Sequence, residues 1–563
     1  MLLDLSLCRF ANQAWLWANA RACRRFEYAL KWPQETQKAR LFHLLKNNAD
    51  SAFGKAFGFS KIHSIDDFQK QVPLSTYTDY EPWIQRILAG EEKVLTREAV
   101  TRCVPSSGST SARKLIPYTA ALQREFNAAI GPWIADMYRA RPNLKSGPAY
   151  WSVSPAIPET GEATQVPIGF DDDADYLGFA KHLVNATLAV PSSIRFVDDI
   201  QRFRTLTLLF LLRARELRLI SIWHPSFLDL MLNDLSLHWD QLLRDISTGA
   251  RLTPAERAFE SLGRADPRRS KQLAALSPDQ TEKIWPRLGV ISCWGDGPAQ
   301  GSQQALATRF PGATVLSKGL IATEAFVSLP FRNKHPLAIN GHFFEFIDDE
   351  GRVLTAESLQ EGGCYSVAVT TGGGFYRYCL GDRIRVDDFL ARTPTIRFLG
   401  KQDHVSDRFG EKLNAGFVSG ILDELMASLG IQPKFVMLAP EKQVEGEGYV
   451  LYLETRVQPP ADLCLRLETR LSDNPHYRYC LQLGQLKPLR LFRIEGQGNE
   501  RFLDYYLAQG RRLGEIKPAI LSKHTGWSAR FPGNYVGCIS ESGQSEKPMD
   551  IRISSYGNPR HGD

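Results

Sequence analysis

The sequence predicts an α/β fold with more than one domain, and three observations support that prediction. The chain has 563 residues, which is more than a single hydrophobic core normally organises. Between residues 145 and 330, strand-like runs alternate with helical patterns, as they do in domains built on a substantial sheet. From 338 to 400 the pattern changes to short strands and turns. We predict a large N-terminal α/β domain with a β-rich submodule, residues 1–400, and a small α+β C-terminal domain, residues 401–563.

The N-terminal part of the large domain is predicted to be mainly helical. Apolar residues recur at about 3.6-residue spacing through 11–50, with Pro33 as an interruption. A turn precedes the helix expected at Tyr77–Leu88. A short strand is expected at 100–104, and a helix at Thr119–Met137.

The remaining elements follow from periodicity and turn residues. Strands are predicted at Ala149–Ser154, Leu219–Trp223, Val290–Trp294, Thr314–Ser317 and Phe326–Leu329, with helices at Leu206–Leu217 and Phe227–Leu243. In the β-rich submodule, strands are expected at His342–Ile347 and Cys364–Thr370, with a hairpin turn at Asp348–Gly351. The tail domain should contain a glycine turn at 410, helices near 416–428 and 460–472, and strands at 434–439 and 448–455.

Composition is that of an ordinary globular protein, with 43% hydrophobic and 23% charged residues. The net charge of +6 favours anionic ligands without requiring nucleic acid. Nine cysteines without a C-x-x-C pair indicate neither a disulfide framework nor a zinc site. The apolar run Leu206–Leu212 is too short to span a bilayer, and the first residues lack a basic region typical of signal peptides. We expect a cytoplasmic monomer that binds neither membrane nor nucleic acid.

A hydroxyl-rich loop is the first functional candidate. Residues 106–114 read Ser-Ser-Gly-Ser-Thr-Ser-Ala-Arg-Lys, between a predicted strand and a predicted helix. Backbone N–H groups, hydroxyls and a lysine suit phosphate oxygens. The spacing is neither that of a P-loop nor that of a dinucleotide-binding fingerprint, and an ordinary polar loop is the alternative.

Two carboxylates are further candidates. Glu324 follows Ala322 and Thr323 between apolar stretches, and it is either a Mg²⁺ ligand beside a phosphate-binding threonine or an exposed turn residue. Asp382 follows Gly381, and it either accepts hydrogen bonds from a ribose diol or is a salt-bridged turn aspartate.

Two lysines complete the series of motifs, although each alone is typical of a solvated surface. Lys412 ends a Gly-Glu-Lys turn, and Lys517 precedes a proline near the C-terminus. The joint order of the motifs is more informative than any one of them.

This order resembles that of adenylate-forming enzymes, and more closely that of the auxin-responsive (Gretchen Hagen) family of acyl acid amido synthetases in its bacterial branch. The resemblance runs from about residue 25 to 530, nearly the whole chain. It implies a small C-terminal domain that moves between adenylation and acyl transfer. Further matching segments are Ala52–Phe59, Val72–Tyr77, Gly90–Leu95, Ser221–Leu228, Phe343–Phe346 and Phe375–Asp382.

The resemblance also implies a role for each matching residue. The enzyme would use ATP and Mg²⁺ to convert a carboxylic acid into an acyl-adenylate, and would transfer the acyl group to an amine, with an amino acid as the expected acceptor. ATP phosphates would be held by Ser106, Ser107, Gly108, Ser109 and Thr110, and contacted at Ala322 and Thr323. Glu324 would bind Mg²⁺, Asp382 the ribose and Lys412 the α-phosphate, while Lys517 would stabilise the transition state.

Two departures and two alternatives accompany the resemblance. Ser111 stands where the family's loop has glycine, and Lys401 follows Gly400 where adenylate-forming enzymes commonly have arginine. An acyl-CoA ligase would use the same activation with a thiol acceptor, and a non-catalytic nucleotide-binding protein would keep only the binding. The acid pocket is expected around Trp151, Ile168, Trp223 and Phe227, which would otherwise be core residues.

Overall fold

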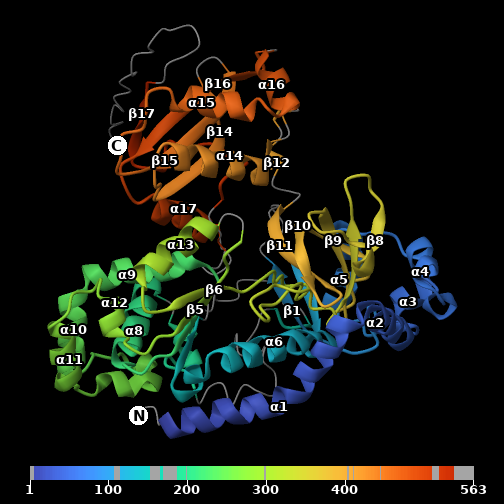
Figure 1. Cartoon of the computed structure of the whole chain (residues 1–563), viewed down its shortest axis with the longest axis horizontal. Helices are drawn as coiled ribbons and strands as arrows, with labels where there is room; N and C mark the ends of the chain where they lie inside the picture. Colours follow the sequence, from blue (N-terminus) through green and yellow to red (C-terminus); the bar gives the residue numbers. More distant parts are fainter. Residues whose placement is uncertain are drawn as a thin grey trace, which may run out of the picture. The chain divides into compact units, whose positions relative to one another are not determined.

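The structure of the chain is a computed structural model (Figure 1). It describes residues 5–106, 114–152, 165–168, 187–197, 199–296, 299–401, 405–406, 408–409, 411, 413–443, 446–482, 484–509, 516 and 519–537. The chain divides into two compact units. The first spans residues 1–403 and takes in 507–517, and the second comprises 404–506 and 518–563.

The first unit begins with helices whose starts are encoded locally. Pro33 occupies the first turn of the second helix, and Ser64 and Thr76 form capping boxes with Asp67 and Asp79. These caps satisfy backbone N–H groups that have no partner within a helix. The helices are α1 (Leu5–Lys31), α2 (Pro33–Asn48), α3 (Ala52–Ala56), α4 (Ile65–Gln71) and α5 (Tyr77–Leu88), with the 3-10 helix η1 (Phe59–Lys61).

An antiparallel strand pair and a long helix follow. The strands are β1 (Val100–Ser106) and β2 (Lys114–Thr119), and the helix is α6 (Ala120–Ala140). Thr119 caps this helix by accepting a hydrogen bond from the Leu122 backbone N–H at 3.1 Å. The 3-10 helix η2 (Pro142–Ser146) then leads into the first sheet.

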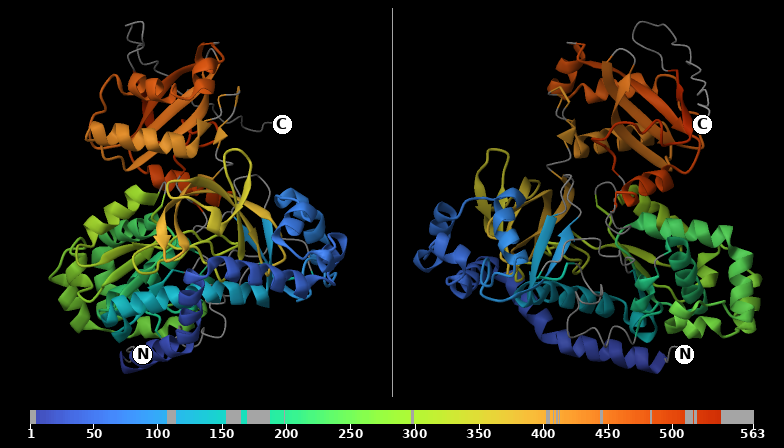
Figure 2. Two further views of the ribbon diagram at one scale, coloured as in Figure 1. Left: turned by 45° about the vertical axis from the view of Figure 1, so that its right-hand side comes forward. Right: turned by 180° about the vertical axis from the view of Figure 1, so that it is seen from behind.

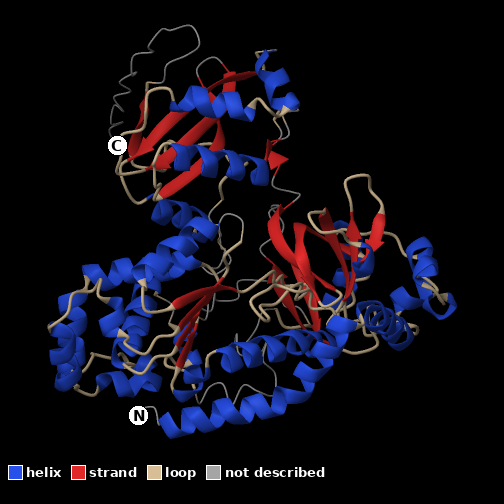
Figure 3. Ribbon diagram, in the orientation of Figure 1, coloured by secondary structure: helices blue, strands red, loops and turns tan. Residues whose placement is uncertain are grey.

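The first sheet is parallel, with strands in the order β3-β4-β5-β6. Helices gather beside it in Figure 3. The strands are β3 (Ala149–Trp151), β4 (Leu219–Ser221), β5 (Val290–Cys293) and β6 (Thr314–Ser317). The helices are α8 (Ile200–Arg213), α9 (Pro225–Leu237), α10 (Trp239–Thr248), α11 (Pro267–Ala274), α12 (Thr281–Ile284) and α13 (Gln300–Arg309), with η4 (Ser192–Phe196) and η5 (Pro254–Gly263).

This parallel sheet separates two hydrophobic cores. Leu219 and Val290 pack into a core shared with α6 and the aromatic residues of the antiparallel sheet. Their neighbours Ile220 and Ile291 point the other way, into the core formed with the helices α8–α13. Successive residues on a strand face opposite sides, so strands buried on both faces need to be apolar throughout.

The second sheet of the first unit is antiparallel, in the order β11-β10-β9-β7-β8. Figure 2 shows both sheets from two further sides. The strands of the antiparallel sheet are β7 (Phe343–Ile347), β8 (Val353–Thr355), β9 (Cys364–Thr370), β10 (Tyr378–Leu390) and β11 (Thr393–Lys401), with η7 (Ala356–Ser358) after β8. The rings of Tyr80 and Tyr376 stack on Phe53 at 5.7 and 5.1 Å, which ties the N-terminal helices to this sheet.

The second unit is an α+β domain around the sheet β14-β15-β16-β17. Only β15 and β16 run parallel among its described strand pairs. Its strands are β14 (Phe435–Gln443), β15 (Gly446–Glu454), β16 (Leu486–Ile494) and β17 (Gly533–Val536), beside the short pair β12 (Val405–Ser406) and β13 (Leu413–Asn414). Its helices are α14 (Ala415–Ser428), α15 (Leu463–Leu471), α16 (Pro475–Gln482) and α17 (Gly498–Leu507).

The predicted α/β architecture with a β-rich submodule and a small α+β C-terminal part is confirmed. The prediction of a strand at Phe326–Leu329 was wrong: these residues make only isolated bridges, to Ile321 and Leu337. The turn expected at Gly410 lies outside the described residues. Within the described ranges, no helix is long and apolar enough to cross a membrane.

Candidate active site

Glu324 lies in a tight turn after the parallel sheet. The turn is closed by a hydrogen bond from the Ala322 backbone N–H to the Ala325 carbonyl at 2.9 Å. Gly319, with a φ of 73°, starts this segment, and a Cβ there would lie 2.7 Å from the Ser328 carbonyl oxygen. Glu324 itself is only 7% exposed. The alternative of an exposed turn residue was therefore wrong, because the turn directs this carboxylate inward.

Tyr378 connects this turn to the antiparallel sheet. Its hydroxyl donates a hydrogen bond to Glu324 Oε1 at 3.4 Å, and its ring stacks on Phe375 at 4.4 Å. Burial raises the pKa of Tyr378, and the neighbouring charges of Glu324 and Asp382 raise that pKa further. The hydroxyl therefore stays protonated as a donor to Glu324, and Asp382 lies four residues further along the same strand.

Asp382 owes its position to an irregularity in β10. Cys379 pairs with Ala368, but the next paired residue, Arg383, faces Ser366, so β10 carries extra residues at this point. Gly381 within the bulge has a φ of 71°. Asp382 is buried inside a strand. The alternative of a turn aspartate was therefore wrong.

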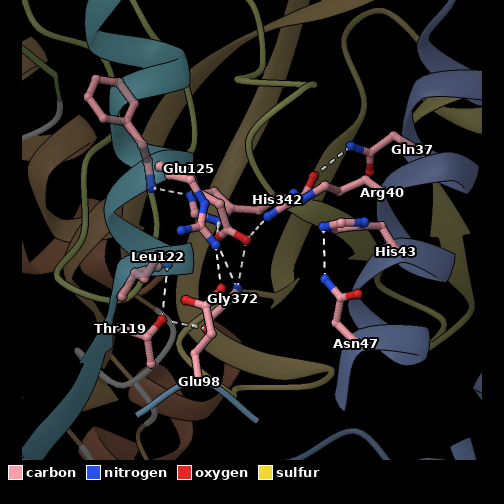
Figure 4. A network of polar contacts seen from close by, with 12 residues as sticks. Gln37, Arg40, His43, Asn47, Glu98, Thr119, Leu122, Glu125, His342 and Gly372 are labelled. Atoms are coloured by element: carbon pink, nitrogen blue, oxygen red, sulfur yellow. Dashed lines mark hydrogen bonds and ion pairs between the residues drawn. The ribbon is translucent and has the colours of Figure 1, made fainter. Parts of the chain in front are cut away.

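A buried polar network holds the loops on either side of these carboxylates (Figure 4). Glu125 on α6 accepts from Arg40 and from the Gly372 backbone N–H at 2.7 Å, and it bonds His342 Nδ1 at 2.7 Å. His342 Nε2 accepts from the Phe326 backbone N–H at 3.0 Å, so the ring proton is on Nδ1. Burial and the charge of Arg40 lower the pKa of His342 to about 3, so the imidazole ring stays uncharged near neutral pH.

Arg377 fixes the segment that leads into β10. Its backbone is left-handed, with a φ of 52°, which is costly for a residue other than glycine. Its N–H donates to Thr370 Oγ1, its Nε to Glu345 at 3.0 Å, and its Nη1 to the carbonyls of Gln69 and Val72. The buried ion pair and these bonds compensate for the strain.

The predicted phosphate loop is anchored at both ends. Ser106 pairs with Lys114 across β1 and β2, so a strand, and not the expected helix, follows the loop. Ser107, Gly108, Ser109 and Thr110 lie outside the described residues, as does the side chain of Ser106. The Lys114 amine lies 5.8 Å from the ring of Tyr77. Burial raises the pKa of Tyr77, and the charge of Glu324 adds to this rise. The Tyr77 hydroxyl accepts a hydrogen bond from the Leu115 backbone N–H at 2.7 Å, and Ser75 forms a bridge with Tyr378, the residue that donates to Glu324. These contacts link the base of the loop to the Glu324 turn.

Two lysines were predicted to act from the C-terminal domain. Lys412 and Lys517 lie outside the described residues, so their predicted roles stay predictions. In the part of the chain that is described, the structure thus brings together Glu324, Tyr378 and Asp382 within the first unit. This arrangement suits a nucleotide and a cation. It offers the carboxylate of Glu324 in a turn, the carboxylate of Asp382 at a bulge, and Lys114 at the base of the hydroxyl-rich loop.

Two of the residues expected to line the acid pocket come together around a lysine that the sequence did not single out. Trp151 and Trp223 both face Lys318, with ring centroids 5.8 and 4.8 Å from its Nζ. Ile168 instead pairs with Cys103 on β1, and Phe227 packs against the core beside the parallel sheet. The only sequence signal for Lys318 was its place at the end of a predicted strand.

Comparisons with known proteins agree over most of the chain. The GH3 family N-terminal domain matches residues 22–315, the central domain 335–401 and the C-terminal domain 424–526. Indole-3-acetic acid-amido synthetase GH3.3 of Arabidopsis thaliana is 23% identical over 553 residues, covering 89% of this chain and 91% of its own. Probable indole-3-acetic acid-amido synthetase GH3.1 of Oryza sativa subsp. japonica is 24% identical, with 89% of each chain covered.

A solved structure shows the same fold. AtGH3.15 acyl acid amido synthetase in complex with 2,4-DB superposes with a TM-score of 0.81 and 19% identity, over 90% of this chain and 94% of that one. The three family domains occur in order and cover most of the residues. The chain is therefore a member of the GH3 family.

Proposed function

We propose that this protein is an ATP-dependent acid–amino acid ligase. It activates a carboxylic acid as an acyl-adenylate and transfers the acyl group to the amine of an amino acid, releasing AMP and pyrophosphate. The observation that carries this proposal is the chain of contacts from the base of the hydroxyl-rich loop, through Tyr77 and Ser75, to Tyr378, which donates to Glu324 and shares strand β10 with Asp382. Curated relatives that match nearly the whole chain are named as acid-amido synthetases.

Magnesium fits the donor groups present. Across the described ranges, no three His, Cys, Asp or Glu side chains gather into a dedicated metal site. Mg²⁺ bound to a nucleotide needs only one or two protein carboxylates, because phosphates and water supply the other ligands. Glu324 would provide such a carboxylate, and Tyr378 orients it through the hydrogen bond to Oε1. The ion would neutralise charge on the phosphates as the acid attacks.

The other roles follow the same chemistry. Asp382 would accept hydrogen bonds from the ribose hydroxyls. Ser106, Ser107, Gly108, Ser109 and Thr110 would hold phosphates, together with the contacts at Ala322 and Thr323. Lys412 and Lys517 would add positive charge at the α-phosphate, where the negative charge of two reacting anions accumulates. The acyl-CoA ligase alternative would differ only in its acceptor, and the relatives' names favour an amine. A bacterial-branch origin, a cytoplasmic location, a monomeric state and the absence of nucleic-acid or membrane partners stay predictions.

ATP–pyrophosphate exchange tests the proposal. Purified protein with Mg²⁺ is assayed against aromatic, indolic and aliphatic acids, and products with amino acids are sought by mass spectrometry. We expect exchange with at least one acid and an amide product. Glu324→Gln should lower exchange at least about 100-fold, with partial recovery at high Mg²⁺, because a metal ligand is weakened. ATP binding without exchange or product for any acid would favour the non-catalytic alternative.

A further inference from the structure

A buried lysine that pairs with no carboxylate of the described residues lies at the edge of the parallel sheet where ligands bind in open α/β folds. Lys318 follows β6, and Trp151, Ser221 and Cys293 end β3, β4 and β5, so all four lie at the carboxyl ends of parallel strands. In such sheets the ligand site is outside these carboxyl ends. The strands β5 and β6 can be followed in Figure 1.

The lysine is enclosed mainly by aromatic rings. Its Nζ lies 4.8, 5.7 and 5.8 Å from the ring centroids of Trp223, Trp133 and Trp151, and it donates to Ser221 Oγ at 2.9 Å. Lys318 is only 5% exposed. Among the described residues, no carboxylate pairs with it. An ammonium group has three donors, and Ser221 satisfies one, while indole faces are weak acceptors for the others.

Burying the amine of Lys318 in these surroundings costs free energy. Burial lowers the pKa of Lys318 to about 7, and the nearby Cys293 thiol opposes this shift. A well-packed apolar side chain would fill the same space without desolvating a charge. Buried ionisable groups with strongly perturbed titration concentrate at functional sites. Packing of the core therefore does not explain why a lysine occupies this position, whereas binding of a ligand would.

The lysine is connected to the proposed reaction centre. Trp133 packs against Phe326 at 6.3 Å, and Phe326 lies two residues after Glu324 in the same loop as Lys318. Trp223 is 39% exposed and is the most exposed of the three rings, so its displacement would open the amine to a ligand. Trp133 and Trp151 pack edge to face at 6.2 Å, so a flat molecule would take the place of Trp223, with its far end at the amine and its carboxylate toward the loop that carries Glu324.

We propose that Lys318 and its three tryptophans form the distal end of the acid pocket, and that they select a flat, aromatic acid with an oxygen acceptor remote from the reacting carboxylate. This inference rests on the proposed function, because it names the substrate class of that ligase. The acceptor would be a hydroxyl, phenolate or second carboxylate. A substrate oxygen would supply the hydrogen-bond partner that the ammonium lacks, and the rings would stack on the substrate body.

Matched acid pairs test this selectivity. Phenylacetate is compared with 4-hydroxyphenylacetate and 4-carboxyphenylacetate, and indole-3-acetate with its 5-hydroxy derivative, in ATP–pyrophosphate exchange. The wild-type kcat/KM should favour the oxygen-bearing member of each pair by about 10- to 100-fold. Lys318→Met should bring this ratio close to one. Lys283→Met, which removes an exposed lysine on α12, is the matched control and should leave the ratio unchanged.

Other variants and readouts keep the test decisive. Lys318→Gln retains a donor without charge, and should keep part of the hydroxyl preference but lose the carboxylate preference. An unchanged ratio in Lys318→Met or Lys318→Gln would overturn the inference, and so would a wild-type preference for the plain acid. Acid binding without ATP, followed by tryptophan fluorescence, gives the same ratio from dissociation constants. Lack of exchange with every acid would contradict the proposed function, while this binding ratio would still decide the role of Lys318.

Discussion

Replacing Lys318 with methionine should make the protein more stable. The pKa of about 7, against 10.5 for an exposed lysine, corresponds to about 5 kcal/mol at roughly 1.4 kcal/mol per pH unit. Three indole faces oppose this penalty, each by about 0.5–1 kcal/mol. The buried amine therefore costs about 2–3 kcal/mol at pH 7. Methionine has a similar shape and carries no charge, so Lys318→Met removes this cost.

The pH dependence of the stability difference identifies its origin. Because burial depresses the folded-state pKa, the unfolded chain binds a proton that the folded chain releases between pH 7 and 10.5. The stability advantage of Lys318→Met should be full below pH 7 and nearly absent by pH 10.5. Urea unfolding at pH 7 and pH 10 measures it, with Lys283→Met as control. A variant less stable than wild type at pH 7, or an advantage independent of pH, would refute the reasoning.

Three further predictions concern other described residues. Asp382→Asn should raise the KM for ATP by about 10- to 100-fold with a smaller change in kcat, because a charged acceptor for ribose is lost; an unchanged KM would rule out that role. Arg377→Met should cost about 3–5 kcal/mol of unfolding free energy, since it leaves the Glu345 carboxylate buried without its ion-pair partner, with the Gln69 amide as a remaining donor. Removing the exposed Arg352 should change stability little. Because the pKa of His342 is about 3 when folded, wild-type stability should fall as the pH drops from 6.5 toward 3, and His342→Asn should be less sensitive to acid in urea unfolding.

Elements with local start and stop signals were predictable from the sequence. Tyr77–Leu88 is a helix with the predicted bounds, because Thr76 and Asp79 form its capping box. Thr314–Ser317 is a strand as predicted. Phe326–Leu329 has the same apolar, β-branched character, but no continuous strand pairs with it, and its side chains are used in the core. Local propensity does not distinguish these two outcomes.

The geometry of the candidate site depends on contacts between residues that are distant in the sequence, more than on local sequence signals. Glycine and aspartate at 381 and 382 favour a turn locally, yet pairing with β9 and β11 places them inside a strand as a bulge. The carboxylates were identified from the motif, whereas their burial and the Tyr378 hydrogen bond were not predictable. Lys318 was missed because its partner rings come from residues far away in the sequence.

The most direct test of the central claim is ATP–pyrophosphate exchange by wild type and Glu324→Gln, run in parallel on one active acid with ATP binding measured separately. We predict acid-dependent exchange in the wild type, a loss of at least about 100-fold in the variant and ATP binding reduced far less. Equal exchange by both proteins would contradict the assignment of the Mg²⁺-binding carboxylate. Absence of exchange from the wild type with every acid, while ATP still binds, would contradict the ligase itself.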